Sequence, residues 1–517
     1  MINKLHFLKN DISVVGEIQF DSDLNEISRQ LKELRKPVFL ANDRIVFVQD
    51  KPDEYPFING YGKQLIEIQK IVDQIDISNC FVLILTPNTN VKKEIASINK
   101  AYSIDSTVFD YCVYPGEYEI SVPVYKNTAC KKQWNQLYVG TDANVLPCCV
   151  ADHRFPTGNV SQNSVSEILN SDKDQNIRQW MMQGYRVKEC EKCYSQEDNQ
   201  LQSRREKFVP NKVERDRIKH LDVRLNNICN FKCRMCSEYF SSSIQQETIE
   251  IYGTDAFLSH EKVNLNPVTR KSRQSNLDKI LPYVSSDLES IYFAGGEPLI
   301  TEEHYKILDQ LINLENLDVQ IVYNTNLSKL KFKNKNVLDY WKKFPNVRVG
   351  ASIDASDLVA EYVRHGTIWK DTLDNINDIK IQTPHVKLEI QSTVQWMNIE
   401  NLIQLQTKWI NSGLFNKEDL MITTLRTPLF LNISSLPVAH KKRLTKKIKN
   451  HINNIGQCEL AQHWAEAKNF MNSTNSQYTL DEFTKTTQKL DNHRKESFVE
   501  VFPQFSDIYS VANDQQI

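Results

Sequence analysis

Residues 229–236 read Cys229-Asn-Phe-Lys-Cys233-Arg-Met-Cys236 and place three cysteines at spacings of x3 and x2. An apolar run from His220 to Leu225 precedes them and predicts a strand. Three thiolates can hold three irons of a cubane [4Fe-4S] cluster, whose irons are otherwise held by four cysteines. The fourth iron is then open, and an open coordination position is where a catalytic metal binds and activates a ligand. The stretch therefore predicts a catalytic iron–sulfur site directly after a strand.

A structural zinc site is the alternative for these three cysteines. Zinc sites usually combine a C-x2-C pair with a second, distant pair of ligands. An isolated triplet with x3 and x2 spacing is unusual for zinc, so the iron–sulfur hypothesis is favoured.

Short apolar strands alternate with helical patterns from residue 216 onward. The expected strands are His220–Leu225, Leu288–Ala294, Val319–Tyr323, Val347–Ile353, Val386–Val394 and Leu420–Leu425. Strands separated by helices favour a parallel sheet, with active residues on the loops that follow the strands. The sequence therefore predicts an α/β fold, a partial (β/α)6 TIM-like barrel, over residues 216–430.

Glycine and polar residues stand at the ends of these strands. Ala294-Gly295-Gly296-Glu297-Pro298 follows the second strand, and its two glycines would let the backbone approach a ligand closely, although a plain turn is the alternative. Asn324 closes the third strand, and Ser352 closes the fourth, with Arg364 shortly after it. Gln391 and Thr393 in the fifth strand point the same way by alternation, and they would lie near the substrate or SAM if that face looks into the barrel.

The cysteine spacing resembles the signature of the radical S-adenosylmethionine (SAM) enzymes, C-x3-C-x-φ-C, with Met235 in the φ position. The segment 294–298 is similar to the G-G-E-P motif of that family, whose core is a six-stranded partial barrel. The resemblance implies a [4Fe-4S] cluster on Cys229, Cys233 and Cys236, with SAM chelated by the open iron. One electron would then split SAM to a 5′-deoxyadenosyl radical, which abstracts a hydrogen atom from a substrate.

The resemblance also implies residues that contact SAM. The backbone of residues 295–297 would bind the amino group of SAM, and Ser352 would reach the ribose. Asn324 could hydrogen-bond the ribose or the substrate. Arg364 would bind the SAM carboxylate, because a guanidinium matches a carboxylate bidentately. A surface salt bridge to Glu361 is the alternative for this arginine.

Residues 126–215 form a second cysteine region. Its cysteines are Cys130, Cys148, Cys149, Cys190 and Cys193. Short alternating strands on both sides of Asp142-Ala-Asn144 predict a hairpin, because Asn and Asp tolerate the positive φ of such turns. A zinc site built from the two cysteine pairs is the alternative here, because the C-x2-C pair Cys190/Cys193 is a common half of a zinc site.

This region resembles the twitch domain, the shortened relative of the SPASM domain found in many radical SAM enzymes. By that resemblance Cys130, Cys148, Cys190 and Cys193 would hold an auxiliary iron–sulfur cluster. Cys148 is preferred to Cys149, because adjacent cysteines cannot easily both face one small cluster. Ala143 stands where the family favours glycine, and the region precedes the core, whereas the commoner order places it after.

Composition limits the remaining choices. The chain has 517 residues, which suggests three or four domains, and its net charge of -2 gives no indication of nucleic-acid binding. No apolar run is long enough to span a membrane. Eleven cysteines without a secretory signal favour a reducing compartment, so a cytoplasmic location is expected.

The two ends of the chain carry no chemical motif. Residues 1–125 predict a small α/β domain, with strands near 37–41, 44–48 and 80–85 and helices near 64–74 and 91–102, and residues 431–517 predict a helical region. The expected partners are SAM, a substrate that is a peptide, a protein or a small molecule, and an electron donor such as flavodoxin or ferredoxin. A radical SAM oxidoreductase or modifying enzyme is the favoured function. The alternatives are a non-catalytic zinc-binding protein and a radical SAM methylase.

Overall fold

The computed structural model describes residues 128–510 except 183, 185, 199–201, 255–269 and 474–479, together with six strands before residue 128. The helices expected near 64–74 and 91–102 lie outside the described residues. The chain divides into two compact units. One is Met1–Trp134, Val150–Thr157 and Leu169–Asp216, and the other is Asn135–Cys149, Gly158–Ile168 and Arg217–Ile517. These units depart from the predicted boundaries, because parts of the 126–215 region belong to the second unit.

The second unit is organised around a nine-stranded sheet with the order β19-β18-β16-β13-β12-β10-β7-β8-β9. The six predicted strands are β10 (His220–Val223), β12 (Ser290–Phe293), β13 (Gln320–Thr325), β16 (Val347–Ala351), β18 (Lys387–Val394) and β19 (Leu420–Thr424). Neighbours among these six pair in parallel, which confirms the predicted parallel sheet. Their carboxyl ends therefore meet at one edge, where the loops with the candidate residues begin.

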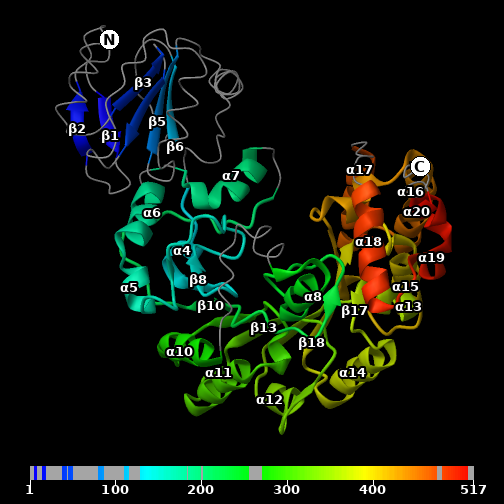
Figure 1. Ribbon diagram of the computed structural model, residues 1–517. Coiled ribbons are helices and arrows are strands. Elements are labelled where there is room, and N and C mark those ends of the chain that lie inside the picture. Colours follow the sequence, from blue (N-terminus) through cyan, green and yellow to red (C-terminus); the bar gives the residue numbers. More distant parts are fainter. Residues whose placement is uncertain are drawn as a thin grey trace. The chain divides into compact units, whose positions relative to one another are not determined.

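Helices follow the strands as the sequence pattern predicted. They are α8 (Ser242–Tyr252), α10 (Arg270–Ile280), α11 (Glu302–Asn313), α12 (Val337–Trp341), α14 (Trp369–Gln382) and α15 (Ile399–Asn411). Figure 1 shows α10, α11, α12 and α14 along one side of the strands. Apolar side chains with helical spacing bury one face of each long helix, which is the usual source of helix stability in proteins.

The two faces of this sheet differ in chemistry. Val223, Phe293 and Tyr323 share one row of the register and are fully buried, and the Tyr323 ring lies 5.4 Å from that of Trp341 in α12. The opposite face, here called the inner face, carries Tyr138, Asp222 and Tyr292 in the neighbouring row. The helices thus cover the apolar face of the sheet, and the inner face carries the polar side chains that a binding site needs.

The predicted hairpin of the cysteine region is present but belongs to this sheet. β7 (Gln136–Val139) pairs in parallel with β10, and β8 (Asn144–Leu146) returns antiparallel to β7. β9 (Gly158–Asn159) forms the edge. Ala143 takes φ = 66° in the turn, the left-handed conformation for which the family favours glycine. The hairpin thus extends the parallel sheet instead of forming part of a separate domain.

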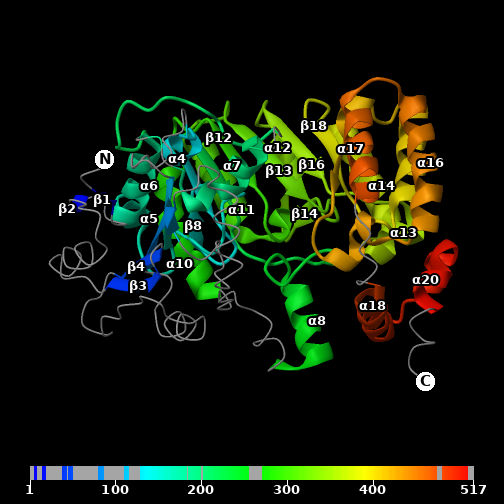
Figure 2. The same ribbon diagram turned by 90° about the horizontal axis from the view of Figure 1, so that it is seen from above.

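The C-terminal region is helical, as predicted. Its helices are α16 (Val438–Ile455), α17 (Glu459–Ser473), α18 (Leu480–Arg494), α19 (Phe498–Val501) and α20 (Ser506–Ser510). Figure 2 shows α16 and α17 side by side beyond the last strands of the sheet. No helix within the described ranges is long and apolar enough to cross a bilayer.

The first unit contains two sheets and the helical part of the cysteine region. β1 (Leu5–Leu8) pairs with β2 (Val14–Ile18), and a second sheet has the order β3-β4-β5-β6, made of β3 (Val38–Asn42), β4 (Ile45–Gln49), β5 (Cys80–Thr86) and β6 (Asp110–Pro115). The predicted strands near 37–41, 44–48 and 80–85 are therefore present. α6 (Asp172–Met182), the 3-10 turn η2 (Lys188–Cys190) and α7 (Glu191–Asp198) follow later in the chain.

Candidate functional site

The cysteine triplet lies on the loop that leaves the carboxyl end of β10. Within it, β11 (Lys232–Cys233) pairs antiparallel with β17 (Arg364–His365), so that Cys233 faces Arg364 in the register. Ser241 then caps α8, because its hydroxyl accepts a hydrogen bond from the Ile244 amide. Two short strands and a capped helix therefore fix both ends of a loop that would otherwise have little regular structure.

The three cysteines lie near one another, with Cys233 buried and Cys229 and Cys236 half-buried. Burial, with a contribution from the nearby Glu297, Cys233 and Cys236, raises the pKa of Cys229 to about 12. Burial and the Cys233 thiol raise the pKa of Cys236 to about 12. Burial also raises the pKa of Cys233, against the opposing effect of Arg364. All three are thus protonated in the metal-free protein, and metal loading must release these protons.

Among the residues that the structure describes, no group of three Cys, His, Asp or Glu side chains is arranged to hold one metal ion. The assignment of Cys229, Cys233 and Cys236 to three irons of one cluster stays a prediction from their spacing in the sequence.

Arg364 lies beside the triplet, where the sequence placed it. Its Nε donates to Asp354 Oδ2 at 2.7 Å, and one terminal nitrogen lies 3.7 Å from Cys233 Sγ. Asp354 is fully buried and also accepts a 2.6 Å hydrogen bond from the Thr393 amide. The Asp354 carboxylate and its neighbours thus orient the guanidinium toward the triplet. The alternative of a surface salt bridge to Glu361 is not what the structure shows.

The glycine pair brings a second loop against the cysteine loop. Gly295 has φ = 114°, and a Cβ on Gly296 would lie 2.2 Å from the Ile228 carbonyl oxygen. The Gly296 amide donates to the Asn226 carbonyl at 3.2 Å. No side chain fits between the two backbones, so glycine is required at 296 for this approach.

The Glu297 side chain makes contacts within the protein that the motif did not predict. Its buried carboxylate accepts hydrogen bonds from the Thr325 hydroxyl at 2.7 Å, the Asn326 amide at 2.6 Å and the Leu299 amide at 3.1 Å. Burial raises its pKa to about 7, against these three hydrogen bonds, which favour the ionised form. The carboxylate is therefore occupied within the protein and ties the glycine loop to the end of β13.

The other expected SAM contacts lie on or near the inner face. A Cβ on Gly350 would meet Gln391 Nε2 at 2.5 Å and Asn324 Oδ1 at 2.9 Å, so these two amides share the space over that glycine. Gln391 therefore shares the inner face with Asn324, and its proximity to SAM or the substrate stays a prediction. Ser352 follows β16 and donates its backbone amide to the Thr325 carbonyl at 2.8 Å. Its half-buried side chain lies at the same end of the strands.

Asn326, which the sequence left open as a hydrogen-bonding amide or as part of an Asx turn, is a neighbour of the triplet. Its Nδ2 lies 3.9 Å from Cys229 Sγ and donates to Asn230 Oδ1 at 3.1 Å. An Asx turn was an equally good interpretation of this residue, and its Oδ1 does accept from the Ser328 amide at 2.9 Å. The Asn326 side chain thus stabilises a turn through its oxygen and places its NH2 group near Cys229.

Arg234, inside the triplet, is held by the C-terminal region. Its guanidinium donates to Asp491 of α18 and, at 2.6 Å, to Glu496, and it lies 3.7 Å from the centre of the Tyr362 ring. The Tyr362 hydroxyl also donates to Asp491, at 2.8 Å. Asp491 and Glu496 are more than 250 residues away in sequence, and no local pattern pointed to them.

A second set of ion pairs joins α18 to α8. Arg494 donates to both carboxylate oxygens of Glu247, at 2.9 and 2.6 Å, and both side chains are almost fully buried. Lys232 of the cysteine loop also lies 3.4 Å from Glu247. The cysteine loop therefore lies between the strands of the parallel sheet and α18 of the C-terminal region, which Figure 1 shows near β17.

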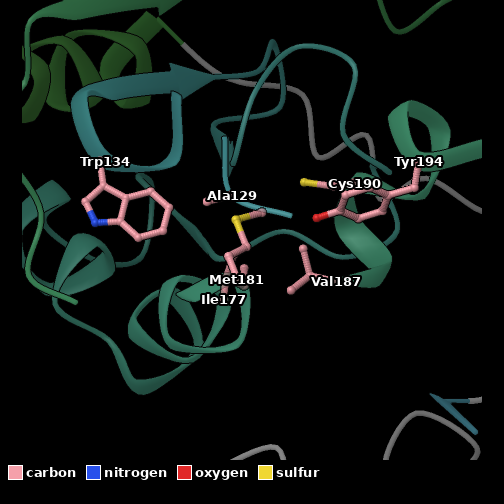
Figure 3. Close-up of a cluster of buried hydrophobic side chains, with 7 residues drawn as sticks. All are labelled: Ala129, Trp134, Ile177, Met181, Val187, Cys190 and Tyr194. Carbon is pink, nitrogen blue, oxygen red and sulfur yellow. The ribbon is translucent and has the colours of Figure 1, made fainter. Parts of the chain in front are cut away.

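Three of the predicted auxiliary ligands lie in the first unit. Cys130, Cys190 and Cys193 are all buried, and none forms a disulfide. Burial raises the pKa of Tyr194, and the Cys190 and Cys130 thiols add to this rise, which places both near its hydroxyl. Figure 3 shows Cys190 beside the Tyr194 ring at the edge of an apolar cluster. Cys148 belongs to the second unit, and its role as a ligand stays a prediction.

Two family models match parts of the chain. Residues 223–389 match the radical SAM superfamily, and residues 130–194 match SPASM, an iron–sulfur cluster-binding domain. The chain contains a radical SAM domain. This domain indicates an enzyme that uses a [4Fe-4S] cluster and SAM, and the preceding match adds an auxiliary iron–sulfur domain. The order of the two matches is the one expected from the sequence, whereas the twitch assignment stays a prediction.

Solved structures give only distant matches. The SAM-bound structure of anSMEcpe is 18% identical, with a TM-score of 0.30, over 52% of this chain and 66% of that one. SuiB of Streptococcus suis bound to its precursor peptide SuiA is 13% identical, with a TM-score of 0.30, over 60% of this chain and 68% of that one. At this level the matches carry no argument about function. A comparison with curated proteins gave no match.

Proposed function

We propose that the chain is a radical SAM oxidoreductase or modifying enzyme whose cluster is held by Cys229, Cys233 and Cys236. The observation that carries the proposal is the triplet itself, one buried and two half-buried cysteines on one loop after β10, within the radical SAM match. When bound, the cluster and SAM supply a 5′-deoxyadenosyl radical that removes a hydrogen atom from the substrate. A peptide or protein is the proposed substrate class, and an electron donor such as flavodoxin or ferredoxin would supply the electron.

The residues around the triplet support distinct tasks. Arg364, fixed by Asp354, presents a permanent positive charge at Cys233 and would bind the SAM carboxylate. Backbone groups of the 295–297 loop would bind the SAM amino group, because Gly295 and Gly296 have no side chains that would block access to the backbone. Asn324 and Ser352 would contact the ribose or the substrate from the ends of β13 and β16. The partial barrel formed by the six parallel strands would exclude water from the reacting atoms.

The auxiliary site would be held by Cys130, Cys190 and Cys193, with Cys148 as the fourth ligand. The buried thiols of the first three and the iron–sulfur match over residues 130–194 support this assignment. Full ligation by four cysteines would suit electron transfer to or from the product radical better than substrate binding. The location of the chain is proposed to be cytoplasmic, where such thiols stay reduced.

The proposal is tested by metal content and by SAM cleavage. Anaerobically purified protein should contain at least about four irons per chain and little zinc. With dithionite and SAM it should form 5′-deoxyadenosine, and a Cys229→Ala/Cys233→Ala/Cys236→Ala variant should not. A colourless, zinc-loaded wild-type protein without SAM cleavage would instead support a structural zinc protein.

A further inference from the structure

Arg224 is a buried arginine on the inner face that the proposed function does not use. It follows β10 directly, two residues after Asp222, so both side chains belong to the inner face. The side chain is only 15% exposed, and Asp222 Oδ1 lies 3.7 Å from its Nε. Among the described residues the guanidinium makes no hydrogen bond, and its Nε is buried without a hydrogen-bond partner. Within this part of the chain, the long ion pair with Asp222 is thus its only contact with a charged group.

Two tyrosine rings flank this guanidinium. Tyr138 of β7 and Tyr292 of β12 stand in register with Asp222 on the two neighbouring strands. Their ring centres lie 5.5 and 5.8 Å from the Arg224 Cζ. Cation–π contacts of this kind hold an arginine in place without using its N–H donors. The β7 strand of the hairpin is therefore what completes the environment of Arg224.

An arginine in this state is prepared for an anionic ligand. A guanidinium carries five N–H donors, and the Nε donor of Arg224 is buried without a hydrogen bond, which costs free energy. Asp222 lies on the Nε side, so the two terminal nitrogens remain for a planar or tetrahedral oxyanion. Arg224 also lies only five residues before Cys229, on the same loop. A ligand on its terminal nitrogens would thus lie at the end of the strands where the cysteine loop begins.

We propose that Arg224 binds an oxyanion group of the substrate, a carboxylate or a phosphate, between Tyr138 and Tyr292. The identification of this ligand as the substrate rests on the proposed function, whereas the anion site itself does not. The extra β7 strand would then have a role in substrate selection as well as in structure. Substrates that lack an acidic group would bind more weakly.

The test measures anion binding directly, without turnover. Reconstituted holoenzyme is titrated anaerobically with acetate and, separately, with inorganic phosphate by calorimetry at constant ionic strength. We expect wild-type protein to bind at least one anion and Arg224→Gln to bind it about tenfold more weakly or worse, since hydrogen bonds to a charged group are lost. Binding of acetate alone indicates a carboxylate, and binding of phosphate alone indicates a phosphoryl group.

Arg348→Gln is the matched control. Arg348 lies on the same face, but its Nε already donates to Glu389 at 2.7 Å, so its loss should leave anion binding unchanged. Arg224→Lys keeps the positive charge but loses the bidentate geometry of the guanidinium, so we expect it to bind the anion severalfold more weakly. This variant keeps the test valid if Arg224→Gln fails to fold. Equal binding by wild-type protein and both Arg224 variants, or no binding of either anion by wild-type protein, would overturn the inference.

These outcomes are separate from those of the proposed function. A wild-type protein that cleaves SAM but binds neither anion contradicts the Arg224 site alone. A protein that binds an anion through Arg224 but forms no 5′-deoxyadenosine, with its iron present, contradicts the radical SAM proposal alone.

Discussion

Substitution of Asp491 by asparagine tests whether the C-terminal region holds the cysteine loop. One oxygen of Asp491 accepts from Arg234 and from the Tyr362 hydroxyl at 2.8 Å, and the other accepts from the Phe498 amide at 2.7 Å. Asparagine has one acceptor oxygen and one NH2 group, so it cannot accept at both positions. It also leaves the Arg234 side chain, 3% exposed, with Glu496 as its remaining carboxylate partner.

The expected cost follows from these contacts. Breaking a buried ion pair by removing one partner costs about 3–5 kcal/mol, and the retained Glu496 places Asp491→Asn near the lower end, about 3 kcal/mol. Urea unfolding measures the free energy of unfolding, and hydrogen exchange of residues 229–236 shows where protection is lost. Asp507→Asn is the control, because this carboxylate is 66% exposed beside His440 and should cost less than about 1 kcal/mol. A loss below about 1 kcal/mol for Asp491→Asn, or unchanged exchange in 229–236, would refute the reasoning.

Three other variants test separate parts of the structure. Gly296→Ala places a methyl group 2.2 Å from the Ile228 oxygen and should cost about 1–3 kcal/mol in urea unfolding, with a lower iron content after reconstitution. Arg364→Gln removes the positive charge held by Asp354 near Cys233, so the cluster should become harder to reduce by roughly 50 mV in an EPR-monitored titration, and an unchanged potential would argue against this contact. Burial lowers the pKa of His304 from 6.5 to about 3, so its neutral form is favoured on folding and stability is lost as pH falls below 6.5. Between pH 7 and pH 5 wild-type protein should lose about 2 kcal/mol more than His304→Phe, and parallel curves would contradict this assignment.

Local sequence patterns predicted the parallel sheet well because each strand is buried on its helix-covered face. The apolar runs expected as strands at His220–Leu225, Leu288–Ala294 and Val319–Tyr323 become neighbouring parallel strands, and the polar residues after them lie where loops begin. The Cys229–Cys236 spacing is likewise a local pattern that can be recognised in the sequence.

Contacts between distant segments could not be read from the sequence. Nothing near Asp491 indicates that it would meet Arg234, because the pairing depends on how α18 folds back onto the cysteine loop. The motif predicted a backbone contact from residues 295–297 to SAM, and only the structure shows that the Glu297 carboxylate accepts hydrogen bonds from Thr325, at the end of β13, and from Asn326. The hairpin at Ala143 was predicted, but its pairing with β10 was not, because the local sequence pattern does not show which strand a hairpin will pair with.

Formation of 5′-deoxyadenosine is the most direct test of the central claim. Reconstituted wild-type protein is incubated anaerobically with SAM and dithionite beside Cys229→Ser, Cys233→Ser and Cys236→Ser variants, and Cys458→Ser serves as the control for a cysteine outside both groups. The account predicts 5′-deoxyadenosine from wild-type protein and Cys458→Ser, and none from the three triplet variants. Equal product from the triplet variants, or none from wild-type protein that holds its iron and is supplied with acidic peptides as substrate candidates, would contradict it.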